Sequence, residues 1–197
     1  MKTKYLSLAY APRQFVWLLI LLGLVGILFI ACQPKAPIIP KEEEMALSIS
    51  SSAFQEGERI PTKYSCQGQD VSPPLTWSES PAGTRSLALI VDDPDAPGGV
   101  FTHWVLFNLP ADSRELAEAV PTQSQLPNGA LQGKNDFGKT GYGGPCPPPG
   151  SPHRYRFNLY ALDKVLDLKP GASKKQVLEA MEGHILAQGQ LIGTYQR

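Results

Sequence analysis

The sequence is poor in the residues that usually build metal and catalytic sites, with three cysteines and three histidines among 197 residues. No two cysteines have C-x-x-C spacing, and no two histidines have H-x-H or H-x-x-x-H spacing, which disfavours a zinc site. The G-x-S-x-G motif of serine hydrolases is also missing. We therefore expect a protein that is not an enzyme and uses no metal or cofactor. A hydrolase based on Cys146 and His153 is an alternative that no motif supports.

An excess of basic residues is absent as well. The chain has 18 Lys and Arg residues against 18 Asp and Glu. Three of the cations, Lys2, Lys4 and Arg13, precede Cys32 with no acidic residue among them, which leaves 15 basic against 18 acidic residues in the rest. A surface that follows a phosphate backbone needs a basic excess, so nucleic acid is not an expected partner.

The N-terminal segment has the pattern of an export signal. The three early cations are followed by an uninterrupted apolar run, residues 15–31, which ends at Cys32. Residues 29–31 resemble the cleavage site of bacterial lipoproteins, in which the cysteine is lipidated and becomes the mature N-terminus. We therefore predict a lipoprotein signal at 1–32 and an exported, membrane-anchored protein on the periplasmic or outer-surface side. An uncleaved anchor is the alternative, although 17 residues are at the short end for a bilayer span.

A flexible tether is predicted at residues 33–45, because Pro34, Pro37 and Pro40 precede a charged run at 41–44. The remaining residues, 46–197, are expected to form one mainly β domain. Its strands are predicted at 47–50, 75–77, 86–91, 101–109, 153–162 and 184–195. The 86–91 strand is apolar on both faces, so it should be central in its sheet. For 184–195, a continued helix is the alternative.

One clear helix start is present. Ser173 and Gln176 have the spacing of a capping box, and Gly183 suits the C-terminal cap. Val177, Leu178 and Met181 are the expected buried stripe of this helix. A further helical turn is predicted within 113–119. Together these elements indicate a β-sandwich decorated by a few short helices.

The stretch 141–162 changes character at His153. Residues 141–152 hold four Gly and five Pro, which excludes a regular helix or an interior strand and predicts a rigid loop. From His153 the pattern alternates, and His153 and Tyr155 share the apolar face with Phe157 and Leu159. We therefore expect both polar tips to line the wall of a pocket beside the loop.

A second histidine, His103, has a comparable place near the start of the 101–109 strand, on the face of Val105 and Phe107. Because both histidines adjoin Pro- and Gly-rich loops, we predict that they share one site. The loop after the central strand adds carboxylates. We expect Asp93 to be a pocket wall residue and Asp95 to brace its own loop through local backbone hydrogen bonds.

This set of groups suits a small anion. Imidazoles and the Tyr155 hydroxyl can donate hydrogen bonds to phosphate or carboxylate oxygens, and Gly143 and Gly144 can present backbone N–H groups. Asp93 can hold one imidazole nitrogen and direct the other at the ligand. Cys66 and Cys146 both lie in loop-like settings, and a disulfide between them is a hypothesis that the sequence cannot decide.

Four ordered motifs give the chain a resemblance to a known family. DPDAP at 93–97, HWVL at 103–106, YGGPCPP at 142–148 and HRY at 153–155 resemble the phosphatidylethanolamine-binding protein (PEBP) family, in its bacterial Raf kinase inhibitor-like (YbhB/YbcL) branch. The resemblance implies a large β-sheet packed on a smaller one, with a pocket for phosphate, phosphoryl headgroups or acetate-like anions. It implies that the following residues line or adjoin that pocket: Asp93, His103, His153, Gly144, Pro145 and Tyr155.

The leading hypothesis is therefore a membrane-tethered, non-enzymatic protein that binds a small anion or a phospholipid headgroup. The rival is a protein-interaction module similar to a protease or kinase inhibitor, in which the loop 141–152 is inserted into a partner such as a protease.

Overall fold

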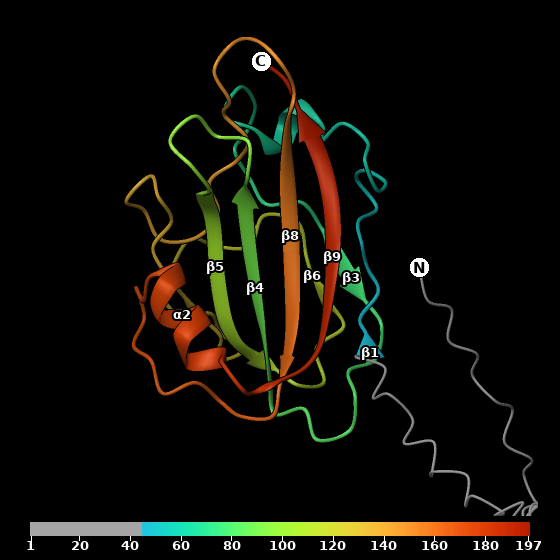
Figure 1. The fold of residues 1–197 in the computed structure, drawn as a ribbon, viewed down its shortest axis with the longest axis vertical. Helices are drawn as coiled ribbons and strands as arrows, with labels where there is room; N and C mark the ends of the chain where they lie inside the picture. The colour runs from blue at the N-terminus through green and yellow to red at the C-terminus, as the bar shows by residue number, and fades with distance from the viewer. Residues whose placement is uncertain (1–44) are drawn as a thin grey trace, which may run out of the picture. The chain divides into compact units, whose positions relative to one another are not determined.

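A computed structural model describes residues 45–197, which form two β-sheets and an α-helix (Figure 1). The large sheet has the strand order β1-β9-β8-β4-β5-β7, and the small sheet has the order β2-β3-β6. The strands are β1 (Met45–Ala46), β2 (Ile49–Ser50), β3 (Leu75–Trp77), β4 (Ser86–Asp93), β5 (Phe101–Pro110), β6 (Glu115–Leu116), β7 (Leu131–Gln132), β8 (His153–Leu162) and β9 (Ile185–Tyr195). The helices are the 3-10 turn η1 (Thr62–Tyr64) and α2 (Lys174–Met181). The expected mainly β fold is confirmed.

The predicted signal at 1–32, with Cys32, and all but the last residue of the predicted tether at 33–45 lie outside the described residues, so these stay predictions. Within 45–197, no helix has the length and apolar character that a membrane span requires.

The large sheet is built around β4, as its two-sided apolar pattern predicts. β4 pairs antiparallel with β5 on one side and β8 on the other, and every residue of β4 is buried. One face of the sheet packs against the small sheet in a core that includes Leu89, Trp104 and Phe157. The other face carries a second core, in which Ile90 and Phe107 pack with residues of α2. Figure 1 shows α2 beside the lower part of β5.

Helix α2 begins as its sequence predicts. The Ser173 hydroxyl accepts a hydrogen bond from the Gln176 backbone N–H, and the Gln176 side chain accepts one from the Ser173 N–H. Val177 and Met181, four residues apart, are buried against the sheet, but Leu178 is 39% exposed and does not belong to the buried stripe. Residues four apart share one helix face, whereas Leu178 is rotated away from that face.

Two segments differ from the sequence-based prediction. The expected strand 47–50 is shortened to β2 at Ile49–Ser50, which joins the small sheet. β1, at Met45–Ala46 just before it, joins the large sheet, and the chain crosses between the sheets at residues 47–48. The helical turn expected within 113–119 is absent, and β6 occupies this position. Glu115 and Leu116 pair with β3, so hydrogen bonds of the small sheet replace the local bonds of a helix.

Candidate functional site

A cavity of about 160 Å³ lies at the end of the large sheet where β4 stops and where β5 and β8 begin, the upper end in Figure 1. Its lining residues come from these strand ends and from two loops: Asp93, Ala96, Pro97, Phe101, His103, Phe137, Cys146, Pro147, Pro148 and His153. The structure therefore brings both predicted histidines and Asp93 to one small space.

His153 is held by Asp93. Its ring Nδ1 lies 2.7 Å from Asp93 Oδ2, and both residues are buried. Because an ionised carboxylate can only accept hydrogen bonds, Nδ1 carries the proton and donates a hydrogen bond to Asp93. The other Asp93 oxygen accepts a hydrogen bond from the Asp95 N–H at 2.8 Å. Asp93 thus closes its own loop and orients the imidazole, which leaves Nε2 of His153 as the nitrogen available to a ligand.

His103 reaches the same cavity through an irregularity in β5. Val91 pairs with Trp104 but Asp92 pairs with Thr102, so His103 is an extra residue in its strand, as in a β-bulge. Its ring contacts that of Tyr155, which belongs to the core between the sheets. Val105 and Phe107, which were predicted to share its face, pack instead in the core under α2. The predicted alternation of β5 is therefore wrong at this point.

The protonation of His103 is set by burial and by one carbonyl. Its Nδ1 lies 2.7 Å from the Gly143 oxygen, an acceptor, so Nδ1 carries the proton. Burial lowers the pKa of His103 below its ordinary value of 6.5, and this outweighs the opposing effects of the Gly143 carbonyl and of the carboxylates of Asp93 and Asp136. His103 is thus a neutral imidazole at pH 7, with an unprotonated Nε2.

Tyr155 lies behind the cavity, outside its lining residues. Its ring centroid is 5.1 Å from that of His103, in an edge-to-face arrangement. The Tyr155 hydroxyl is buried and has no hydrogen-bond partner among the described residues. Burial raises the pKa of Tyr155 far above its ordinary value, and the charge of nearby Asp93 adds to this. The phenol is therefore a neutral group that supports the His103 ring.

Gly144 and Pro145 fix the loop and do not line the cavity. The Gly144 N–H donates to Asp70 Oδ1 at 2.7 Å, and the Gly143 N–H donates to the His103 carbonyl at 2.9 Å. The Pro145 carbonyl accepts from the Cys66 N–H at 3.1 Å. Both glycine amides are thus engaged within the protein. The expectation that Gly143 and Gly144 present N–H groups to an anion is wrong, because both N–H groups already donate to acceptors within the protein. The sequence does not show which acceptor a loop N–H group will bond.

Cys66 and Cys146 form a disulfide in the structure, with their Cα atoms 5.4 Å apart. The bond joins the loop that follows η1 to the wall of the cavity, which Cys146 lines. A sulfur bonded in this way is not a thiolate, so the arrangement gives no support to a hydrolase based on Cys146.

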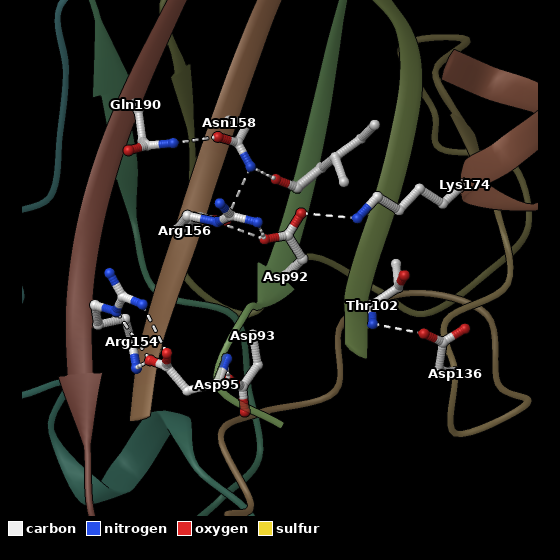
Figure 2. Close-up of polar contacts among 11 residues, drawn as sticks. Asp92, Asp93, Asp95, Thr102, Asp136, Arg154, Arg156, Asn158, Lys174 and Gln190 are labelled. Atoms are coloured by element: carbon white, nitrogen blue, oxygen red, sulfur yellow. Dashed lines mark hydrogen bonds and ion pairs between the residues drawn. The ribbon is translucent and has the colours of Figure 1, made fainter. Parts of the chain in front are cut away.

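Asp95 braces its loop through a partner that local sequence does not reveal. Both of its carboxylate oxygens accept from the Arg154 guanidinium, at 2.9 and 2.6 Å, and one also accepts from the Arg154 N–H (Figure 2). The Arg154 hydrogen bonds lower the pKa of Asp95 to about 2. The contact joins the loop after β4 to the start of strand β8. Asp95 therefore positions Asp93 and His153 without lining the cavity.

The aromatic wall of the cavity was not predicted. Phe101 and Phe137 pack edge to face at 4.7 Å between centroids, and each also contacts the His103 ring. Phe101 shares a strand with His103, so its position could have been inferred. Phe137 lies in a segment rich in Gly and Pro without a periodic pattern, so nothing in the local sequence indicates that its side chain lines the cavity.

The charge of the cavity is low. Asp93 is the acidic group of the lining, His103 is neutral, and no Lys or Arg is among the lining residues of the described chain. Within 45–197 there is also no group of three or more His, Cys, Asp or Glu residues placed to hold a metal ion. Any anion bound here would depend on imidazole protons for its electrostatic attraction.

Two packed sheets with a small histidine- and aspartate-lined cavity at one sheet end make this domain a β-sandwich with a candidate ligand pocket. Comparison with known proteins gives the particular group. The chain belongs to the phosphatidylethanolamine-binding protein family, because the sequence model of that family matches residues 50–196. This confirms the resemblance inferred from the four motifs.

The relatives of the chain include archaeal and bacterial proteins. A "UPF0098 protein" of Methanothermobacter thermautotrophicus is 58% identical over 151 residues, which is 77% of this chain and 99% of that protein. The "Putative lipoprotein LppC" of Mycobacterium tuberculosis is 42% identical over 168 residues, covering 83% and 81%. Among solved structures, YbcL of Escherichia coli, described as a member of the mammalian PEBP family, has a TM-score of 0.72 and 35% identity over 78% of this chain and 99% of its own. CT736 of Chlamydia trachomatis has a TM-score of 0.71 and 46% identity over 77% and 98%.

Proposed function

We propose that this protein binds a small anion, such as a phosphate or a phosphoryl group, and catalyses no reaction. The observation that carries the proposal is the arrangement of the two imidazoles. Both histidines line one cavity, and each has its Nδ1 engaged by the protein, at 2.7 Å in both cases. The two Nε2 atoms are therefore the nitrogens that a ligand would meet.

The size of the cavity limits the ligand. A water molecule occupies about 30 Å³ in the liquid, so a cavity of about 160 Å³ has room for roughly five waters or for one phosphate-sized group. Phe101, Phe137 and the prolines of the lining offer apolar contact for the substituent of a phosphate ester.

Replacement of both His103 and His153 by Ala should abolish the NMR shifts that inorganic phosphate induces in the wild-type chain. Hydrogen bonds to charged groups contribute about 1.5–3 kcal/mol each, so losing two should weaken binding about 100-fold or more. His184→Ala is the matched control, because His184 pairs with Asp163 and lies outside the cavity lining. Unchanged phosphate shifts in a folded double variant would overturn the proposal.

The rival function, insertion of the loop 141–152 into a protein partner, is limited by the burial of this loop. Residues 141–145 and Pro147 are buried, and residues 148–152 are exposed. Only this tip could enter a partner protein. If a protease is inhibited at full strength by the double histidine variant, and changes at the tip remove that inhibition, the interaction module is favoured over the anion-binding protein.

We further propose that the protein is exported and anchored to a membrane through lipidated Cys32. The pattern of residues 1–32 supports this, as does the name of the relative LppC. Radiolabelled palmitate should label the wild-type chain expressed in a bacterium, and Cys32→Ser should remove the label. Equal labelling of the two chains would contradict the lipoprotein assignment.

A further inference from the structure

The disulfide connects the outside of the protein to the cavity. Cys66 is exposed on the loop after η1 and is not part of the cavity lining, whereas Cys146 is half-buried and lines the cavity. An external thiol can therefore approach the Cys66 sulfur more readily than the Cys146 sulfur. Access and the identity of the attacked sulfur are two of the factors that set the rate of thiol–disulfide exchange.

A cation lies beside the other sulfur of the pair. Arg197 Nη1 is 3.7 Å from Cys146 Sγ. When a disulfide is opened, one sulfur leaves as a thiolate, and a neighbouring guanidinium stabilises that negative charge. Exposure of Cys66 and the position of Arg197 thus favour the same direction of cleavage, with attack at Cys66 and departure of Cys146.

The two joined segments are also held together without the covalent bond. The Cys66 N–H donates to the Pro145 carbonyl at 3.1 Å, and the Gly144 N–H donates to Asp70 at 2.7 Å. The Tyr142 hydroxyl donates to the Tyr64 carbonyl at 2.9 Å. Opening the disulfide would therefore release the Cys146 side chain while the surrounding backbone stays in place.

We propose that the Cys66–Cys146 disulfide is a thiol-exchange site that controls the charge of the cavity wall. A low-molecular-weight thiol, as its thiolate, attacks Cys66 Sγ. A new bond forms between the attacking sulfur and Cys66 Sγ, the Cys66–Cys146 bond breaks, and Cys146 leaves with the electron pair as a thiolate beside Arg197. A second thiolate then attacks the sulfur of the first thiol in the mixed disulfide. This step frees Cys66 as a thiolate, which takes up a proton from solvent. The protein has then gained two electrons, and the two small thiols have been oxidised to their disulfide.

The consequence for binding rests on the proposed anion-binding function. The thiolate of Cys146 adds a negative charge to a cavity whose lining already holds Asp93 and lacks Lys and Arg. At a separation of a few ångströms such a charge repels an anion appreciably, even in a partly hydrated site. The opened protein should therefore bind phosphate at least tenfold more weakly than the oxidised protein at pH 8.

The exchange can be tested on the full-length chain in detergent, with Cys32→Ser so that Cys66 and Cys146 are the two remaining cysteines. The probe is 2-mercaptoethanol, followed by N-ethylmaleimide and peptide mass spectrometry. We expect the mercaptoethanol adduct on Cys66 and the maleimide on Cys146. Arg197→Gln should slow the opening several-fold, and Arg85→Gln, a cation elsewhere on the surface, should not. Adducts mainly on Cys146, or no reaction in excess thiol, would overturn the proposal.

The effect on the cavity is tested separately. Inorganic phosphate is titrated into the oxidised form, into the form carrying the Cys66 adduct, and into Cys66→Ser, which leaves Cys146 free. Equal affinities in all three forms, or loss of the folded NMR spectrum when the bond opens, would overturn control of the cavity by the disulfide. If the oxidised form itself binds no phosphate, the proposed function fails, and the mass spectrometry alone decides on the exchange.

Discussion

Dimethyl phosphate is expected to bind about tenfold more weakly for each unit by which the pH is raised above the titration range of His103. This ligand keeps a single negative charge throughout, so any change in affinity reports on the protein. Burial holds the pKa of His103 below 6.5 in the free protein, with the proton of the neutral ring on Nδ1. An anion can accept a hydrogen bond from Nε2 only if the ring takes up a second proton.

The direction of this effect follows from linkage. A bound anion favours the protonated ring, so binding is coupled to the uptake of one proton, and the affinity rises as the pH falls. The groups around His103 are Asp93, Asp136, His153 and Tyr155, and the two carboxylates assist the protonation. Isothermal titration calorimetry from pH 5 to 9, in two buffers of different ionisation enthalpy, measures both the affinity and the proton uptake. A flat profile would show that the ligand is held by neutral groups.

Replacing Gly144 by Ala is expected to lower the free energy of unfolding by about 3 kcal/mol and to abolish phosphate binding. A Cβ atom at this position would lie 2.3 Å from the Tyr64 carbonyl oxygen and 2.8 Å from Ser65 Cα. Both contacts are with backbone, which cannot move aside as a flexible side chain can. Overpacking of this kind typically costs about 1–3 kcal/mol. The shift would also displace Gly143, whose carbonyl orients the His103 ring.

Urea denaturation and phosphate titration of the same variant measure both effects. Gly98→Ala is the matched control, because Gly98 is in the loop after β4 and a Cβ there meets nothing within 4 Å. A Gly144→Ala protein within 0.5 kcal/mol of the wild type would show that the two loops are not packed as closely as described.

The elements with a strong local pattern were predicted from the sequence to within a residue. The alternation from His153 to Leu162 gives the bounds of β8, and the run that ends at Tyr195 gives those of β9. The capping box at Ser173 marks the start of α2. In each case the signal is local, since side-chain periodicity and cap chemistry depend on residues a few positions apart.

The features that were missed depend on contacts between distant segments. The bulge at His103 is invisible in a sequence that alternates regularly, because it is defined by the pairing of β5 with β4. The engagement of Gly144 depends on Asp70, which lies 74 residues away. In the same way, β6 is formed by its pairing with β3. The residue types of the site could therefore be predicted from the sequence. The sequence did not show which backbone N–H groups are already hydrogen-bonded within the fold and so cannot bind a ligand.

The described chain enters the large sheet at the end opposite the cavity. Met45 pairs with Ala187 near the start of β9, whereas His153, beside the cavity, pairs with Tyr195 at its end. Eight residues of strand at about 3.3 Å each place these two points about 26 Å apart. The cavity and the first described strand therefore lie at opposite ends of β9.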